Sequence, residues 1–236
     1  MKKNLKTPIK PYSFQFNNLI LVEGKDDLEF IVSFLKKLEI DDKIYVHEVG
    51  GISGIFGSGD KSLKMIIKDS NFKKNVRNLA IIFDEDGEKN RFKEIIRDIE
   101  KLNKENDDIN FVILNGDITL SSKSTKPITI SISIDLFKPD LESLILKSLD
   151  NKEYEEILKN CIPKFFKCCD LKDAKPKNII QALLSTQISK KEFKTVKDIA
   201  TLAQREASAK FNKKFINYDH KEFNNIKKFL KDFIKK

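Results

Sequence analysis

The sequence predicts an α/β fold with a mainly parallel sheet, helices on both of its faces, and a helical C-terminal region. Two observations support this prediction. Short apolar runs such as LILV and LAIIF alternate with longer segments whose apolar residues recur at helical spacing. Runs that are apolar at every position are typical of strands buried on both faces, as they are in parallel sheets. After about residue 150 the strand patterns end and lysine-rich helical patterns follow.

The elements are predicted in chain order. Residues 1–17 contain two prolines and no sustained period, so we expect an N-terminal extension. Strands are expected at residues 18–22, 43–49, 79–83, 110–114 and 128–134. Helices are expected from residue 28 onward, at residues 61–69, 92–102 and 141–149, and along residues 223–233.

The chain of 236 residues is long enough for one large core with a smaller appendage. We therefore expect an α/β domain over residues 18–149 and a helical region over residues 150–236. No linker rich in Pro, Gly or Ser marks the boundary. The helical region is thus either a separate domain or an additional layer on the sheet.

Composition narrows the class of protein. No apolar run approaches the roughly 18 residues of a membrane helix, and residues 1–20 lack the apolar centre of a signal peptide. Neither His47 nor His220 completes a zinc-site spacing with the three cysteines, Cys161, Cys168 and Cys169. We therefore expect a soluble, cytoplasmic protein with reduced thiols and no membrane partner.

The chain is basic. Lys and Arg number 45 against 36 Asp and Glu, a net charge of +9. This balance favours a polyanionic partner such as nucleic acid, because each neutralised phosphate releases counterions. A genome biased toward lysine codons, with the charges on solvated faces, explains the same excess.

Acidic residues follow two of the predicted strands. Glu23 comes directly after the first strand, and Asp84 and Asp86 follow LAIIF. Ligands of open parallel sheets bind at the carboxyl ends of the strands. Two ionised carboxylates about 4 Å apart repel by roughly 4 kcal/mol at an effective dielectric near 20, so such a group needs a cation or shared protons. Oxygen ligands without His or Cys suit Mg²⁺ or Mn²⁺.

Each acidic segment also has a simpler interpretation when it is taken alone. EGKDD, residues 23–27, is an ordinary turn in which Asp26 and Asp27 favour the start of a helix. DEDG, residues 84–87, is a solvated turn. Together, at the ends of two apolar strands and before two helices, they favour a shared site.

Three segments resemble the Toprim domain, which is found in topoisomerases, bacterial primases, the 5S ribosomal RNA maturation nuclease and the overcoming-lysogenization-defect nucleases. They are VEGKDD at residues 22–27, Gly50-Gly51, and FDEDG at residues 83–87. The resemblance implies a Toprim/Rossmann-like fold over residues 18–148. It also implies that Glu23 is the catalytic general acid or base, and that Glu23, Asp84 and Asp86 bind the metal.

The resemblance adds two candidate ligands. The nuclease branch places an acid at the position of Asp27, which implies a role for it with a second metal. PDLESLIL, residues 139–146, is similar to a segment of small stand-alone Toprim proteins, and this implies that Glu142 is a ligand. A helix that begins with Pro139 normally carries an acid in its first turn, so Glu142 has a structural explanation as well.

Basic residues and glycines near the same edge complete the predicted site. Lys25 is expected to assist catalysis, and Lys61, Lys64 and Arg91 are expected to contact nucleic acid, although lysines are frequent on any surface. The backbone of Gly50 and Gly51 is expected to touch phosphate.

The segment GGISGIFGSGDKS, residues 50–62, resembles a nucleotide-binding P-loop only superficially. Asp60 separates the last glycine from the lysine, whereas the P-loop motif requires them to be adjacent. We therefore expect a loop over the acidic edge.

Phenylalanines alternate with basic residues at two places, and they include Phe14, Phe16, Phe165 and Phe166. Such a pattern fits base stacking in single-strand binders. Packing in the core or between domains is the favoured interpretation, because 18 phenylalanines and no tryptophan must fill the interior. His220 is expected near the start of the last helix.

These expectations give two hypotheses on function. The first is a Mg²⁺-dependent endonuclease that hydrolyses DNA or RNA in nucleic-acid processing or anti-phage defence. The chain has no tyrosine in a topoisomerase context and no primase zinc module. The second is a non-catalytic module that docks on an ATPase partner or on nucleic acid. The sequence is compatible with a homo-oligomer, and it leaves open one metal or two, DNA or RNA, and the role of the C-terminal region.

Overall fold

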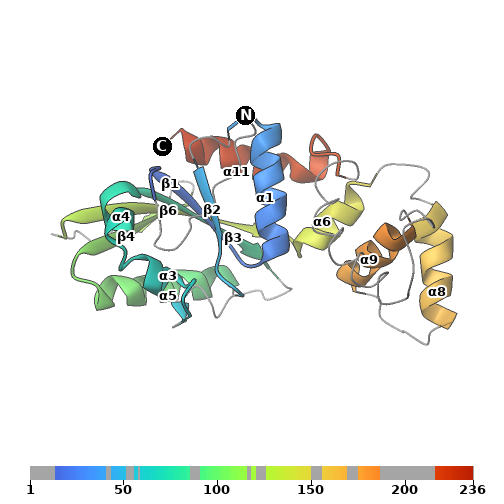
Figure 1. Ribbon diagram of the computed structural model, residues 1–236, viewed down its shortest axis with the longest axis horizontal. Helices are drawn as coiled ribbons and strands as arrows, with labels where there is room; N and C mark the ends of the chain where they lie inside the picture. The colour runs from blue at the N-terminus through green and yellow to red at the C-terminus, as the bar shows by residue number, and fades with distance from the viewer. Residues whose placement is uncertain are drawn as a thin grey trace, which may run out of the picture. The chain divides into compact units, whose positions relative to one another are not determined.

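The computed structural model is shown in Figure 1. It describes residues 14–40, 44–51, 56–57, 59–85, 91–115, 118–120, 126–149, 156–168, 175–186 and 216–235. The chain forms two compact units, one of Met1–Asp140 with Asn225–Lys236, the other of Leu141–Asn224. The predicted boundaries at residues 17/18 and 149/150 stay predictions. The two units divide the chain at other positions: the first unit ends at Asp140 and also includes the last helix.

A six-stranded sheet forms the centre of the first unit, in the order β2-β1-β3-β6-β4-β5. The strands are β1 (Asn18–Val22), β2 (Ile44–Glu48), β3 (Asn78–Asp84), β4 (Ile109–Asn115), β5 (Ile118–Leu120) and β6 (Ile128–Phe137). All neighbouring pairs are parallel except β4 and β5. The predicted α/β fold with a mainly parallel sheet is therefore confirmed.

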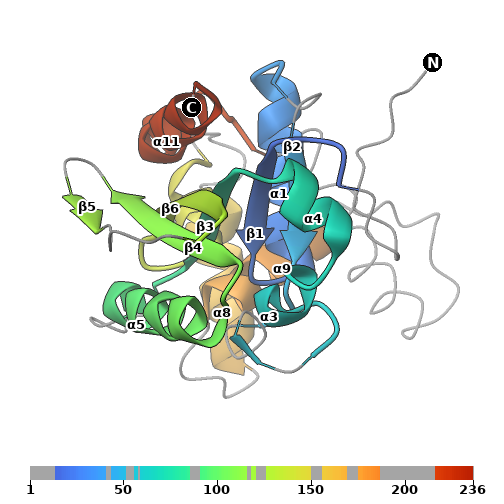
Figure 2. The same cartoon turned by 90° about the vertical axis from the view of Figure 1, so that its left-hand side faces the viewer.

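Helices cover both faces of this sheet. They are α1 (Lys25–Lys37), α3 (Leu63–Ile66), α4 (Ser70–Asn75), α5 (Arg91–Glu105) and α11 (Asn224–Ile234). Figures 1 and 2 show α1 and α11 on one face and α3 and α5 on the other. Within the described ranges, no helix is long and apolar enough to cross a membrane.

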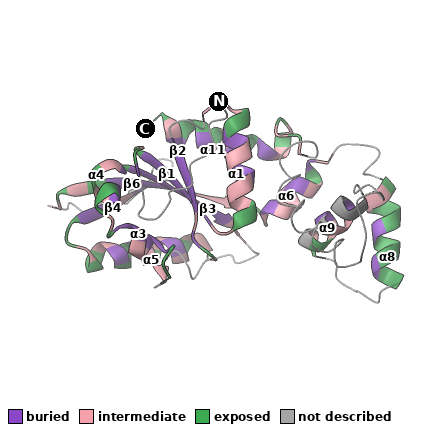
Figure 3. Cartoon of the chain, viewed as in Figure 1, coloured by how far each residue is buried: buried purple, intermediate pink, exposed green. Residues whose placement is uncertain are grey.

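The core extends on both sides of the sheet because its central strands are apolar at every position. In β1, Leu19 and Leu21 join the cluster that contains Ile99 of α5. The alternate residues Ile20 and Val22 are equally buried. Figure 3 shows the central strands buried and the outer sides of the helices exposed. This double burial is why LILV and LAIIF lack the polar alternation of a one-sided sheet.

The register of the strands defines one functional edge. Val22 of β1 pairs with Ile82 of β3, and Asp84 of β3 pairs with Phe137 of β6. Glu23 follows Val22 directly, and Asp84 is the last residue of its strand. Because β1 and β3 are neighbours and parallel, both acids leave the sheet at the same carboxyl edge.

Every secondary-structure element that the structure describes in the second unit is a helix, which confirms the predicted helical C-terminal region. Its elements are α6 (Leu141–Lys147), the π-helix η2 (Ile157–Cys161), α8 (Ile162–Cys168), α9 (Pro176–Thr186) and the 3-10 helix η4 (Lys221–Phe223). A small core of Ile162, Phe166 and Leu183 joins α8 to α9.

The structure differs from the sequence prediction at three elements. The helix predicted at residues 61–69 is the shorter α3, and α4 follows it because the Asp69 side chain caps a new helix by accepting from Asn71 N and Phe72 N. The three-residue strand β5 was not predicted. Strand β6 continues three residues beyond its predicted end at Ile134.

The phenylalanines divide into two groups. Phe14 and Phe166 are buried, and Phe16 packs against the core, as the packing interpretation requires. Phe165 is 58% exposed, so that interpretation is wrong for this residue. Adjacent residues of an α-helix point in directions about 100° apart, so Phe166 packs in the core with Leu183 of α9 while Phe165 is exposed.

Candidate functional site

A pair of glycines fixes the backbone at Glu23. The Glu23 carbonyl accepts hydrogen bonds from Gly50 N at 3.0 Å and from Gly51 N at 2.9 Å. Gly50 has φ +80° and Gly51 φ +95°, conformations that residues with a Cβ rarely adopt. The turn after β2 is thereby fastened to the end of β1. The predicted phosphate contact of this pair stays a prediction, and its amide groups already bond Glu23.

Glu23 and Asp84 are both partly buried at the carboxyl edge. Paired residues of neighbouring strands project to the same face, so Asp84 shares a face with Phe137. That face is the one covered by α1, because the Phe137 ring lies 5.8 Å from the ring of Phe30. Asp84 therefore leaves the sheet on the α1 side.

Asp86, the third predicted metal ligand, lies outside the described residues. Among the residues that the structure does describe, no three His, Cys, Asp or Glu side chains are grouped closely enough to hold a metal ion. The predicted triad is thus reduced to two described carboxylates on adjacent strands. Its metal remains a prediction.

Asp27 acts as a helix cap. Its Oδ2 accepts a hydrogen bond from Gly24 N at 2.9 Å, at the first turn of α1. A carboxylate at this position also interacts favourably with the helix dipole. The helix-start role suggested for Asp26 and Asp27 therefore applies to Asp27, and its predicted role with a second metal stays a prediction.

Two cations stand at helix starts on this edge. Lys25 is the first residue of α1, with its Nζ 3.9 Å from Glu29 Oε1 and its side chain 70% exposed. Arg91 is the first residue of α5, with its Nη1 3.6 Å from Glu94 Oε2 and its side chain only 14% exposed. Because Arg91 is largely buried, its guanidinium is held in a more fixed position than the Lys25 ammonium.

The other two predicted cations have acidic partners. The Lys61 Nζ bonds Glu48 Oε1, at the carboxyl end of β2. The Lys64 Nζ bonds Glu105 Oε2 at 3.0 Å, in the last turn of α5, which leads back toward the start of β4. Lys61 therefore belongs to the carboxyl edge, and Lys64 is directed toward the end of α5. Their contacts with nucleic acid stay predictions.

Glu142 lies in the first turn of α6, in the second unit, where it is partly buried. This position agrees with the predicted helix that begins after Pro139. A first-turn acid is accounted for by the helix dipole, so the position alone does not require a ligand role.

Glu29 is an acid of this edge that the sequence analysis missed. Burial raises the pKa of the Glu29 carboxyl, Lys25 lowers it, and the charges of Asp26 and Glu48 raise it further. Its Oε2 is buried and has no hydrogen-bond partner among the described residues. No sequence pattern marked Glu29, because only the fold brings it near Glu48 at the end of β2.

Asp135 was also missed. It lies on β6 opposite Ile82 and therefore on the same face of the sheet as Asp84. Burial raises the pKa of its carboxyl, while a hydrogen bond from Leu136 N and the charge of Lys138 act in the opposite direction. An acid after ITISISI resembled the end of a strand, so no sequence signal marked it as part of the interior.

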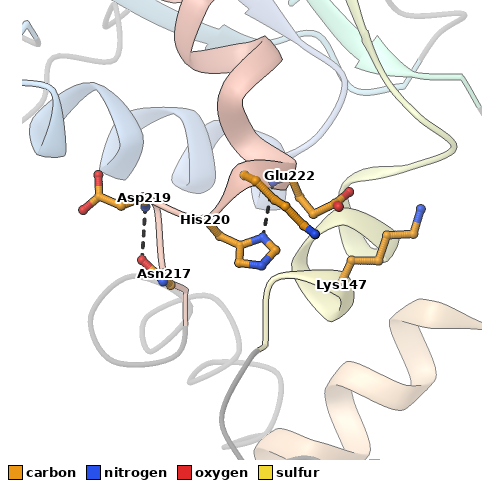
Figure 4. Close-up of a pocket in the computed structure, with 6 residues that line it drawn as sticks. Lys147, Asn217, Asp219, His220 and Glu222 are labelled. Atoms are coloured by element: carbon orange, nitrogen blue, oxygen red, sulfur yellow. Dashed lines mark hydrogen bonds between the residues drawn. The ribbon is translucent and has the colours of Figure 1, made fainter.

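A polar pocket of about 620 Å³ lies in the second unit (Figure 4). Its lining residues are Lys147, Asn217, Asp219, His220, Lys221 and Glu222. The His220 Nδ1 accepts from Glu222 N at 3.3 Å, so the ring caps η4, at the predicted start of the last helix. Two lysines and two acids balance each other, which gives the pocket no charge preference. None of the predicted site residues lines it.

The described acids suit a hard divalent cation by the chemistry of their donors. Glu23 and Asp84 offer carboxylate oxygens only, which is the ligand type of Mg²⁺ and Mn²⁺. Glu29 and Glu48 add to the negative potential at the same edge. A cation there would offset the repulsion among these groups.

The fold and this edge define the class of the protein: an α/β protein with a Rossmann-like parallel sheet and an acidic carboxyl edge. The chain belongs to the family described as "Protein of unknown function (DUF3226)", which matches residues 17–235. No curated protein matches the chain.

Among solved structures, the chain is similar to the C-terminal region of the OLD protein of Xanthomonas campestris pv. campestris. The two are 14% identical, with 85% of this chain and 100% of that chain covered, and the TM-score is 0.31.

Proposed function

We propose that the protein is a divalent-metal-dependent nuclease that hydrolyses phosphodiester bonds of DNA or RNA. The observation that carries the proposal is that Glu23 and Asp84 end two neighbouring parallel strands at one edge. The resemblance of VEGKDD and FDEDG to the Toprim domain supports the same site.

In this proposal Glu23, Asp84 and Asp86 hold Mg²⁺ or Mn²⁺, and Asp27 is a further ligand. The metal would supply charge stabilisation at the phosphate and a more acidic bound water. The role of the Gly50-Gly51 turn is to hold the backbone of Glu23 in place.

The side chains of this edge have separate tasks. Glu23 accepts or donates the proton at its carboxylate. The Arg91 guanidinium, fixed by its burial at the start of α5, provides positive charge for a phosphate oxygen. Lys25 is more exposed and adds positive charge from the first turn of α1.

The experiment is a cleavage assay on single- and double-stranded DNA and RNA, with Mg²⁺, with Mn²⁺ and with a chelator. We expect the chelator to abolish cleavage. We also expect Glu23→Gln and Asp84→Asn each to lower the rate by about 100-fold or more, the usual size of an acid–base or electrostatic contribution.

Two control variants carry the same charge changes elsewhere. Glu100→Gln alters an exposed residue of α5, and Asp107→Asn alters an exposed residue just before β4, at the opposite edge of the sheet. Both are expected to cleave like the wild type. Unchanged cleavage by Glu23→Gln and Asp84→Asn would show that this edge is not the active site. A wild type that binds nucleic acid or an ATPase but never cleaves would favour the non-catalytic module.

A further inference from the structure

We propose that the exposed face of α8 binds single-stranded nucleic acid, with Phe165 stacking on a base and Lys164 contacting a phosphate. The inference rests on the proposed function, because it specifies the form of nucleic acid that the protein takes. It concerns the second unit, and none of the residues at the acidic edge takes part in it.

The central feature is an exposed aromatic ring. Phe165 is 58% exposed, and no other large apolar side chain is exposed among the residues that the structure describes. The next residue, Phe166, is buried in the small core with Leu183. The two rings meet edge to face, with centroids 5.7 Å apart and an interplanar angle of 65°. The buried ring therefore limits how far the exposed ring can move.

The residues around Phe165 leave its face accessible. Cys161, Lys164 and Cys168 are all exposed. With 3.6 residues per turn, these three side chains and Phe165 fall within an arc of about 100° around the helix axis. Figure 3 shows α8 exposed over most of its surface. An apolar ring thus stands at the border of an open, otherwise polar helix face.

The charge of this face complements a polyanion. Residues 156–168 contain three lysines, Lys159, Lys164 and Lys167, and a single acid, Glu156. Neither Lys164 nor Lys167 forms an ion pair with a described residue, and both are exposed. Their positive charges are therefore available to a ligand, in keeping with the net charge of +9.

The combination of ring and cations distinguishes between ligands. Single-strand binders join an aromatic stacking surface to basic residues that follow the backbone. In a duplex the bases are stacked on each other, so an exposed ring finds no free base face. An acidic peptide would satisfy the lysines and would offer no flat partner to the ring. The single strand is the ligand that uses both features.

The test measures binding of labelled oligo(dT), oligo(U) and a duplex of equal length to the full chain by fluorescence anisotropy. We expect tighter binding of the single strands than of the duplex. Phe165→Ala should weaken single-strand binding by about 5- to 100-fold, the range for loss of one stacked base. Phe165→Trp, which keeps a stacking surface, should bind at least as well as the wild type.

The lysine has a separate readout. Lys164→Ala should lower the slope of log affinity against log salt concentration by about 0.7, the contribution of one phosphate contact in a single strand. Lys93→Ala, an exposed residue of α5, is the matched control on the other unit and should leave the slope unchanged. Bound oligonucleotide should also protect the exposed Cys161 thiol from alkylation, as measured by peptide mass spectrometry.

Equal single-strand affinity of Phe165→Ala and the wild type, with matching unfolding temperatures, would overturn the proposal. The proposal would also be overturned if Phe165→Ala lost binding to an acidic peptide and kept its affinity for the oligonucleotides, since this result would identify a protein-docking surface. Cleavage by the wild type and oligonucleotide binding by Phe165→Ala together separate this inference from the proposed function. If the wild type cleaves and Phe165→Ala binds normally, the α8 surface fails alone. If Phe165 governs binding and no cleavage occurs, the nuclease assignment fails alone.

Discussion

At the scale of single residues, Asp135 shows most clearly how burial makes a charged side chain unfavourable. It lies within β6, and burial raises the pKa of its carboxyl. The pKa in the folded state is therefore higher than in the unfolded chain. Below the pKa of the unfolded chain, Asp135 is protonated in both states and its contribution to the stability of the fold is fully present. This stability is lost as pH rises through the pKa of the folded state, because the folded protein must then bury a charge.

Asp135→Asn should accordingly stabilise the protein at neutral pH by about 1 kcal/mol, the usual size of a single-substitution effect. The amide oxygen can keep the bond from Leu136 N, and no charge is buried. The gain should shrink as pH falls toward about 4, the ordinary aspartate pKa. Urea unfolding at a series of pH values measures it, with Asp107→Asn as the exposed control. An identical pH dependence in Asp135→Asn and the wild type would contradict this explanation.

At the scale of elements, the turn after β2 connects strand geometry to the proposed site. Gly51 adopts φ +95° while its N–H bonds the Glu23 carbonyl. A Cβ there meets no neighbouring atom, so the cost of a substitution is conformational and not steric crowding. The turn is thus a place where backbone strain would act directly on Glu23.

Gly51→Ala is expected to lower the free energy of unfolding by about 1–2 kcal/mol, the cost of a left-handed conformation for a residue with a Cβ. Cleavage should fall as well, since a shifted N–H of residue 51 would hold the Glu23 carbonyl less firmly. Gly59→Ala is the matched control, because Gly59 has open space around its Cβ position and no positive φ. Thermal unfolding and the cleavage assay measure both effects. Equal behaviour of the two variants would argue against a positioning role for the turn.

The elements predicted best from the sequence were those with the strongest apolar pattern. LILV and LAIIF became β1 and β3, because strands buried on both faces need apolar residues throughout. The three-residue β5 is too short to produce a pattern. The end of β6 was predicted three residues too early, because the alternating pattern ITISISI stops at Ile134, whereas Asp135 still pairs with Ile82.

The site was predicted to the extent that topology determines it. Acids after β1 and β3 share an edge in any sheet where those strands are neighbours and parallel, and this placed Glu23 and Asp84. The place of Glu29 at this edge depends on how α1 packs near Glu48. The exposure of Phe165 depends on which of the two adjacent rings packs against α9. Contacts of this kind depend on tertiary packing, which leaves no local sequence pattern.

At the scale of the whole molecule, the chain returns at its end to the unit in which it began. Helix α11 belongs to the first unit and buries Ile226, Leu230 and Phe233, at helical spacing along one face. Figures 1 and 2 show it on the same face of the sheet as α1. The last helix is therefore a structural part of the α/β unit.

A chain truncated after residue 224 should lose about 5 kcal/mol or more of stability. The burial of each of the three large apolar side chains contributes about 1.5–3 kcal/mol to the free energy of unfolding, and the truncated chain lacks all three. We expect a large fall in the unfolding temperature of the first unit. Removal of Lys235 and Lys236 alone is the control and should have little effect. An unchanged unfolding temperature after the longer truncation would mean that α11 does not contribute to this core.

The central claim is that the carboxyl edge of β1 and β3 binds a divalent metal, and Mn²⁺ titration by calorimetry tests it most directly. We expect one or two Mn²⁺ ions to bind the wild type and the Asp107→Asn control with the same affinity. Asp84→Asn should bind Mn²⁺ about tenfold or more weakly, since even the loss of a residue that only hydrogen-bonds to a metal ligand lowers metal affinity by about 10- to 100-fold. Equal Mn²⁺ affinity in Asp84→Asn and the wild type, or no binding to the wild type, would contradict the claim.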